Sequence, residues 1–406
     1  MSIDRRKMYK FPWSKTDNPG SWIEVTDKCD LFCPGCYRHT LEGHRSLEEV
    51  KKDILASKKM TNCDRIAIAG GEPLIYPHIL EVVDFIHRQK MKPMILTNGE
   101  KLTWELASAL KKAGLVQFYF HVDSNQGRPG WTDKNENEMN KLRQRLADLV
   151  WELGGVQCGF NVTVFRSALE HIPEIMEWCR VNVHKVQHLS LITNRGILIA
   201  DEVRYMVNGK EIDLDQFKSS STNSEEINIT TDEMFEILES RFPDFRPCAY
   251  LNGTAWPETY KFLMAIHLGT KNKVYGVLGR KTVELAQILH HLVKGKYSAS
   301  LGNPKVGKKI FILSLLDREL RKTFFRFLKE SFRNPLRIFD SIYIQCINLQ
   351  QPNEVFRGET NLCDGCVNMM VYRGELVNSC KLDEYRMFGG PIQPLFHESS
   401  KNIDNG

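Results

Sequence analysis

Residues 29–36 read Cys-Asp-Leu-Phe-Cys-Pro-Gly-Cys, which places three cysteines in the spacing C-x3-C-x2-C. The loop follows residues 22–26, where alternating apolar and polar side chains predict a β-strand. Three thiolates on one short loop can each bind one iron of a [4Fe–4S] cluster, which leaves the last iron open to a small chelating ligand. A structural zinc site usually takes a full set of protein ligands. The loop therefore favours an iron–sulfur cluster over zinc.

Strand-like and helix-like patterns alternate along the first 200 residues. A capping box of Ser46 and Glu49 marks the start of one helix. Strands joined by helices pair in parallel through βα crossovers. We therefore expect an α/β fold with a parallel sheet, either open or curved into a partial barrel. Further strands are expected at residues 66–69, 94–96, 118–122, 160–164 and 188–192.

The tetrapeptide Gly70-Gly71-Glu72-Pro73 follows the second expected strand. Together with the C-x3-C-x2-C loop, it resembles the radical S-adenosylmethionine (radical SAM) superfamily over residues 20–195. The resemblance implies a partial (β/α)6 barrel with ligands at the C-terminal ends of the strands, where barrel enzymes carry their active sites. It also implies a cluster on Cys29, Cys33 and Cys36 and an S-adenosylmethionine site lined by Gly70, Gly71, Glu72 and Pro73.

Other cofactor contacts follow from the same resemblance. The family often has an aromatic residue just before the third cysteine, where this chain has Gly35, so Tyr37 becomes the candidate for contact with the adenine. Asp123, Ser124 and Asn161 match strand positions that the family uses for the cofactor. The alternative for each of these polar residues is that it only caps a helix or ends a strand.

A second group of cysteines lies near the C-terminus: Cys363 and Cys366 form a C-x2-C pair, and Cys380 follows beyond a turn. The group resembles the auxiliary-cluster extensions called SPASM and Twitch. With Cys248 it would supply four ligands to a second [4Fe–4S] cluster, and Cys346 is the alternative fourth ligand. A zinc ribbon is the competing interpretation, since C-x2-C pairs suit zinc equally well.

Residues 257–340 contain 17 Lys and Arg against 6 Asp and Glu, a net charge of +11. Phe324, Phe325, Leu328 and Phe332 recur there at helical spacing, beside a basic face. One interpretation is a packed amphipathic helix with a solvated basic side. The other is a helix on a membrane surface, or a wall around a long anionic amphiphile. We expect no nucleic acid partner, because the aromatic residues do not form a strand-like stacking platform.

The chain divides into four expected parts. Residues 1–200 form the barrel core, and residues 201–254 a linker and a helix that leads to Cys248. Residues 255–345 form a basic, mostly helical insertion, and residues 346–406 the cysteine-rich region and tail. The chain has no apolar run of membrane-spanning length and no secretory signal, so its 11 cysteines are not expected to form disulfides. We expect a cytoplasmic protein, with peripheral membrane contact as a hypothesis for the basic segment.

The resemblance implies an enzyme that cleaves S-adenosylmethionine reductively to a 5′-deoxyadenosyl radical. The radical would take hydrogen from an unactivated carbon of a lipid-like or peptide substrate. The electron donor would be a protein such as flavodoxin or ferredoxin. The competing class is a non-catalytic iron–sulfur, zinc-binding or electron-transfer protein.

Overall fold

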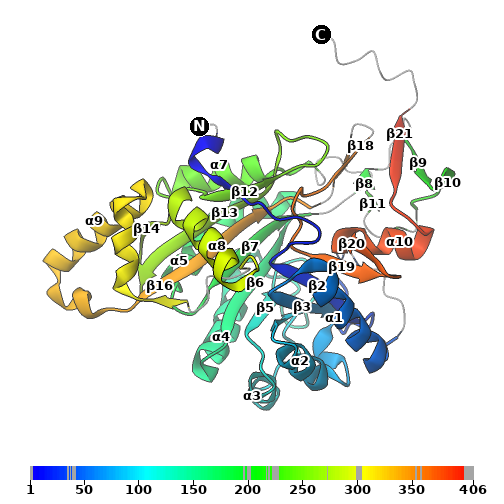
Figure 1. The fold of residues 1–406 in the computed structure, drawn as a ribbon, viewed down its shortest axis with the longest axis horizontal. Helices are drawn as coiled ribbons and strands as arrows, with labels where there is room; N and C mark the ends of the chain where they lie inside the picture. The colour runs from blue at the N-terminus through cyan, green and yellow to red at the C-terminus, as the bar shows by residue number, and fades with distance from the viewer. Residues whose placement is uncertain are drawn as a thin grey trace, which may run out of the picture.

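Parallel strands, curved into part of a barrel, form the N-terminal half of the chain (Figure 1). The structure is a computed structural model that describes residues 3–33, 36, 38, 43–194, 197–198, 203–215, 217, 220–221, 228–271, 273–298, 304–352, 354–356 and 359–396. The expected α/β fold with parallel pairing is confirmed. The strands are, in spatial order, β2 (Gly20–Thr26), β3 (Arg65–Gly70), β4 (Lys92–Thr97), β5 (Gln117–His121), β6 (Gln157–Val164) and β7 (His188–Thr193).

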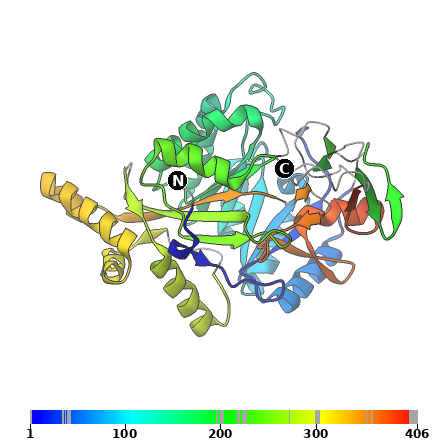
Figure 2. The ribbon, with the colours of Figure 1, turned by 90° about the horizontal axis from the view of Figure 1, so that it is seen from above.

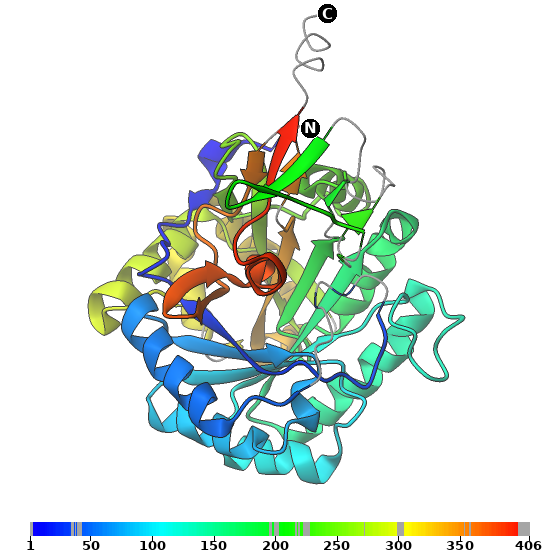
Figure 3. The ribbon, with the colours of Figure 1, turned by 90° about the vertical axis from the view of Figure 1, so that its right-hand side faces the viewer.

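Helices connect these strands and wrap around the outer face of the curved sheet, as Figure 3 shows. The expected capping box starts the first of them: the Ser46 hydroxyl accepts from Glu49 N at 3.3 Å, and the Glu49 carboxylate accepts from Ser46 N at 3.1 Å. The helices are α1 (Leu47–Thr61), α2 (Ile79–Arg88), α3 (Trp104–Lys112), α4 (Glu136–Leu153) and α5 (Ile172–Val181).

The two faces of the barrel sheet differ in polarity. On β5, Phe118 and Phe120 are fully buried in the core that the helices cover. Tyr119 lies between them and belongs to the inner face, because side chains of a strand alternate. Many inner-face positions on the neighbouring strands carry polar groups. The barrel interior is therefore a cavity lined by both apolar and polar side chains, whereas the core that the helices cover is apolar.

Further strands extend the sheet beyond both ends of the half-barrel. β16 (Ile342–Gln350) runs parallel to β7, and β13 (Tyr260–Thr270) and β12 (Ala249–Asn252) follow it. On the other side, β19 (Met369–Tyr372) pairs with β2. Shorter strands complete this sheet: β1 (Tyr9–Lys10), β14 (Lys273–Val277), β15 (Lys305–Val306) and β20 (Glu375–Asn378).

The segment 255–345 is helical only in part. Helices α8 (Arg280–Lys294) and α9 (Arg318–Arg333) and the 3-10 helices η4 (Lys308–Leu315) and η5 (Pro335–Phe339) agree with the expectation. The expectation is wrong for β13 and β14, and β16 runs across the expected boundary at residue 345. β13 is buried along nearly its whole length between β12 and β16. A short apolar run of this kind fits a doubly covered strand as well as a helix.

The C-terminal cysteine loop closes the gap between the two ends of the sheet. Cys363 forms a β-bridge with Gly253, at the end of β12. On the opposite side of the loop, the Asn18 side-chain amide donates to Cys366 O, next to the start of β2. At the centre, a Cβ atom on Gly365 would lie 2.8 Å from Trp13 O, so the loop passes in direct contact with the N-terminal segment. The cysteine-rich region is thus part of the barrel wall.

The remaining elements lie around this framework. The helix expected within residues 201–254 is α7 (Thr231–Arg241), capped by the Thr230 hydroxyl at 3.1 Å from Glu233 N. No helix in the described part of the chain is long and apolar enough to cross a membrane. The other elements are η1 (Arg5–Lys7), η2 (Pro73–Ile75), η3 (Arg166–His171), η6 (Ser379–Lys381), α10 (Leu382–Phe388), β8 (Ile197–Leu198), β9 (Val203–Val207), β10 (Lys210–Ile212), β11 (Ser220–Ser221), β17 (Glu354–Phe356), β18 (Glu359–Asn361) and β21 (Gln393–Phe396).

Candidate functional site

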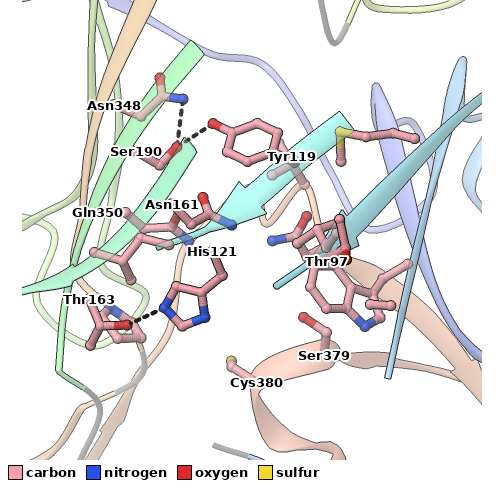
Figure 4. Close-up of a pocket in the computed structure, with 18 of the residues that line it drawn as sticks. Thr97, Tyr119, His121, Asn161, Thr163, Ser190, Asn348, Gln350, Ser379 and Cys380 are labelled. Atoms are coloured by element: carbon pink, nitrogen blue, oxygen red, sulfur yellow. Dashed lines mark hydrogen bonds between the residues drawn. The ribbon is translucent and has the colours of Figure 1, made fainter. Parts of the chain in front are cut away.

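A cavity of about 320 Å³ lies inside the half-barrel (Figure 4). Its wall is built from the barrel strands, the loop after β2, the added strand β16 and the C-terminal region. It reaches from the C-terminal strand ends, at Gly70 and Thr97, to the start of β3 at Arg65. The sulfur-bearing side chains on the wall are Met94, Met264, Cys29, Cys33, Cys36, Cys346 and Cys380.

Cys29, Cys33 and Cys36 all line this cavity, as the first motif predicts. A turn brings the last two together, with Cys36 N donating to Cys33 O at 3.0 Å. Burial raises the pKa of the Cys33 thiol to about 12, and its two partner thiols and Asp123 add to the rise. The Cys33 thiol therefore stays protonated until a cation replaces its proton. A cluster of several irons fits this set of soft sulfur donors. Tyr37 lies outside the described residues.

Two glycines hold the end of β3 against the start of the cysteine loop. A Cβ atom on Gly70 would lie 2.2 Å from Thr26 O, and one on Gly71 would lie 2.1 Å from Lys28 O. At this close approach Gly71 N donates to Thr26 O, and Glu72 N to Lys28 O, both at 2.8 Å. The motif therefore fixes where the cysteine loop begins.

Glu72 ties the ends of β3 and β4 together. Its buried carboxylate accepts from Leu74 N at 2.8 Å, Thr97 Oγ1 at 2.6 Å and Asn98 N at 2.7 Å. Burial outweighs these hydrogen bonds and raises the pKa of Glu72 to about 7. Gly70, Gly71 and Glu72 line the cavity, whereas Pro73 is buried at the start of η2, outside the cavity wall.

Of the three candidates on later strands, Asn161 lines the cavity. It lies beside His121, its partner in the β5–β6 register, and both point into the space that Figure 4 shows. Asp123 lies behind this wall: its carboxylate is 2.7 Å from His121 Nε2 and accepts from Asn125 N at 3.0 Å. Burial alone would raise the pKa of Asp123, but His121 and these hydrogen bonds hold it below its usual value. Ser124 also lies off the wall, with its N donating to Glu136 at 2.6 Å.

The cysteine loop and the glycine motif therefore meet at one cavity on the C-terminal strand ends. Residues 23–179 match the Radical SAM superfamily profile. The chain contains a radical SAM domain. The recognition from the two motifs is confirmed, and the [4Fe–4S] cluster and S-adenosylmethionine are the cofactors that this family uses.

Curated relatives cover only part of the chain. A probable GTP 3′,8-cyclase of Methanocaldococcus jannaschii is 28% identical over 174 residues, which are 39% of this chain and 54% of the relative. The Bacillus subtilis protein AlbA, named for subtilosin biosynthesis, is 32% identical over 94 residues, 22% of this chain and 20% of AlbA. The chain thus spans about half the length of the cyclase it matches.

Solved structures that match part of the chain have low sequence identity and low TM-scores. The anSMEcpe structure with bound AdoMet is 13% identical, covers 71% of this chain and 67% of that chain, and has a TM-score of 0.41. Streptococcus suis SuiB, bound to its precursor peptide SuiA, is 20% identical over 44% of this chain and 39% of that chain, with a TM-score of 0.35.

Behind the cofactor end of the radical SAM domain lies a polar cluster that the sequence did not single out. The Tyr119 hydroxyl is 2.7 Å from Ser190 Oγ, and the Asn348 amide donates to the same oxygen at 3.2 Å (Figure 4). Tyr119 and Ser190 could have been found from strand alternation, since their neighbours are apolar. Asn348 could not, because β16 was not expected.

Arg65 contributes a positive charge to the opposite end of the cavity. Its Nε is buried without a hydrogen-bond partner among the described residues. The adjacent Asp64 instead pairs with Lys92 at 2.6 Å. Burial lowers the pKa of nearby His188 to about 3 and raises that of Cys346 to about 12, so both are neutral. A guanidinium stays charged, so this end of the cavity presents a cation among neutral groups.

Cys363 and Cys366 lie in the closing loop, and Cys380, on η6, is near enough to interact electrostatically with both. Burial raises the pKa of Cys366 to about 12, and Cys380 adds to the rise; Cys363 is raised further, first by burial and then by both partners. Cys380 lines the same cavity as the first cysteine group. Within the described ranges, no three His, Cys, Asp or Glu side chains are arranged to hold a single metal ion.

The structure does not bring Cys248 to this trio. Cys248 precedes β12, whereas Cys363 pairs with Gly253 beyond the other end of that strand. Five residues of strand separate the two sites by about 16 Å, because a strand rises about 3.3 Å per residue. Cys248 instead donates to Met264 O at 3.2 Å, within a hydrophobic cluster. Cys346 does reach the cavity wall, from β16.

Proposed function

We propose that the chain is a radical SAM enzyme. Its support is one observation: the three cysteines of the first motif, Gly70, Gly71 and Glu72 line a single cavity at the C-terminal strand ends. When bound, the reduced cluster would supply one electron to S-adenosylmethionine, and cleavage of the C5′–S bond would give methionine and a 5′-deoxyadenosyl radical able to take one hydrogen atom from the substrate.

The chain's own residues bind, orient and shield these groups. Cys29, Cys33 and Cys36 hold three irons, and the absence of side chains on Gly70 and Gly71 keeps the strand end close to the loop. His121 and Asn161 offer polar contacts to the ribose and the methionine carboxylate, with Asp123 orienting the imidazole of His121. The enclosing strands exclude water, which limits quenching of the radical.

The substrate occupies the deeper part of the cavity, with an anionic group at Arg65. Arg65 and Gly70 stand at opposite ends of β3, about 16 Å apart at about 3.3 Å per residue. The anionic group is thus remote from the carbon that reacts. Binding of this remote group to Arg65 supplies energy that positions the substrate for the chemical step. Such an anionic group is present in an acidic peptide, in a lipid headgroup and in a nucleotide. GTP is the nucleotide in the name of the cyclase relatives.

Cys363, Cys366 and Cys380 hold an auxiliary [4Fe–4S] cluster beside the substrate, with zinc as the alternative. Three thiolates leave one iron open, and Cys380 lies on the wall of the substrate cavity. The cluster can then anchor the substrate or accept an electron from it.

A flavodoxin or ferredoxin supplies the first electron. The basic segment, residues 257–340, makes peripheral contact with a membrane.

The test is anaerobic reconstitution with iron and sulfide, followed by dithionite and S-adenosylmethionine. Wild-type protein should form 5′-deoxyadenosine, and Cys33→Ala should not. Iron-loaded wild-type protein that forms none would instead identify a non-catalytic iron–sulfur protein.

A further inference from the structure

Exposed apolar side chains are concentrated in one segment of the chain. Of the 20 large hydrophobic residues exposed in the described chain, 12 lie between residues 288 and 339, in about an eighth of the sequence. Soluble proteins scatter such residues singly, and a contiguous group marks an interaction surface. Eight belong to the consecutive elements η4, α9 and η5, which we call the α9 arm: Ile312, Leu315, Leu316, Phe325, Phe332, Leu336, Ile338 and Phe339.

The α9 arm projects away from the barrel. Figure 1 places α9 at one end of the long axis, and Figure 2 shows it extending beyond the sheet. Its inner side packs on β14 and η4 through Leu320, Thr323, Phe327 and Ser331, which are buried. The core therefore already uses one face of α9, and the exposed apolar residues are additional to that face.

The outer surface of α9 carries an apolar stripe beside a basic one. Phe325 and Phe332 are seven residues apart, so they lie on the same side of the helix, and they are 60% and 84% exposed. Lys322 and Lys329 are likewise seven apart and stand one turn from Phe325. The acidic residues Glu319 and Glu330 of this helix form ion pairs. Glu319 pairs with Lys322 at 2.8 Å, and Glu330 pairs with Lys273 at 2.7 Å and with Arg333 at 3.2 Å.

The net charge of the α9 arm indicates which kind of partner binds its exposed surface. Residues 305–340 contain 10 Lys and Arg against 4 Asp and Glu, a net charge of +6. One of these acids, Asp317, is buried and accepts from Thr282 N and Leu320 N as a cap. Apolar side chains that enter lipid, flanked by cations that meet headgroups, are the pattern of a helix lying in a membrane interface.

We propose that the α9 arm docks the protein on an anionic membrane surface, with Phe325, Phe332, Leu336 and Phe339 inserted among the lipids. Arg318 and Lys329, which are exposed, contact anionic headgroups. The docking does not depend on the proposed chemistry, since it involves no residue of the cavity.

Vesicle co-sedimentation of the full chain tests the proposal. The vesicles are phosphatidylcholine, with or without about one quarter phosphatidylglycerol. Wild-type protein should sediment with the anionic vesicles at about 0.05 M salt and be released at about 1 M, where the Debye length shrinks to about 3 Å. Protein that stays in the supernatant with anionic vesicles at low salt would overturn the proposal.

Variants assign the binding to the arm. Phe325→Glu/Phe332→Glu should reduce partitioning at least tenfold, and Arg318→Gln/Lys329→Gln by about 30-fold, as each basic residue contributes roughly fivefold. All four side chains are exposed, so the fold should persist. The matched control, Leu80→Glu/Trp104→Glu, places glutamates on exposed apolar positions of α2 and α3 and should bind as wild type.

Two outcomes would contradict the assignment. Equal loss of binding in the control pair would mean that added negative charge alone weakens attachment. A concentration-dependent dimer, detected by light scattering and abolished by the phenylalanine variants, together with no vesicle binding, would identify a second copy of the chain as the partner of the arm.

Discussion

Gly71 is the residue at which the second strand comes closest to the cysteine loop. Gly71→Ala would place a Cβ atom 2.1 Å from Lys28 O, so the loop carrying Cys29, Cys33 and Cys36 must move. We predict a loss of most of the iron bound at that loop and a free energy of unfolding lower by about 1–3 kcal/mol. Iron content after reconstitution and denaturant unfolding measure the two effects.

Gly307→Ala is the matched control for this substitution. Gly307 has φ −72°, which any residue adopts, and a Cβ atom there would come no closer than 4.0 Å to Lys309 N. It should retain iron and stability. Equal iron content in the two variants would show that close packing of the strand against the loop is not required for the cluster.

Arg65, at the other end of the cavity, is the residue that we expect to bind an anion. Arg65 lines the cavity, and its buried Nε has no hydrogen-bond partner among the described residues, so Arg65→Gln should raise the free energy of unfolding by about 1–3 kcal/mol. Phosphate at constant ionic strength should raise the melting temperature of wild type and not of this variant. Arg88→Gln, an exposed arginine on α2, should respond as wild type. The anion site is wrong if phosphate stabilises the Arg65 variant equally.

Among the elements, β13 carries a buried histidine that makes stability depend on pH. Burial, then Arg180, lowers the pKa of His267 to about 3, so the folded protein keeps it neutral. The unfolded chain binds this proton near pH 6.5. Its contribution to stability is complete above that pH and is lost progressively as pH falls towards 3.

His267→Gln should therefore reduce acid sensitivity. Between pH 7 and 5, the free energy of unfolding of wild type should fall by about 1–2 kcal/mol more than that of the variant, at up to about 1.4 kcal/mol per pH unit. Urea unfolding at both pH values measures this difference. Parallel pH dependences would mean that His267 is protonated in the folded protein.

The elements also show what sequence patterns can predict. The barrel strands were predictable because helices separate them and local signals, such as the capping box of Ser46, mark the boundaries. β13 was not, since a continuous apolar run has no period that distinguishes a buried strand from a helix. For the same reason β16 was not predicted, so Asn348 on that strand was not identified as a cavity residue. The distance between Cys248 and Cys363 could not be predicted either, because it depends on the length of β12.

At the scale of the whole molecule, chain segments far apart in sequence build one cavity with a cysteine group at each side. If both groups hold cubanes, the reconstituted protein should bind about eight irons. Replacing Cys29, Cys33 and Cys36 together by alanine should leave about half of them, and replacing Cys363, Cys366 and Cys380 should leave the other half. Zinc with about four irons in wild-type protein would assign a zinc ribbon to the C-terminal group.

We infer that the cluster on the first cysteine loop binds S-adenosylmethionine within the barrel cavity. Electron paramagnetic resonance of the reduced, iron-loaded protein, before and after addition of S-adenosylmethionine, tests this most directly. We expect S-adenosylmethionine to change the spectrum of the wild-type protein and to leave the spectrum of Cys33→Ala unchanged. A wild-type spectrum that S-adenosylmethionine does not alter, or one that changes equally in Cys33→Ala, would contradict the account.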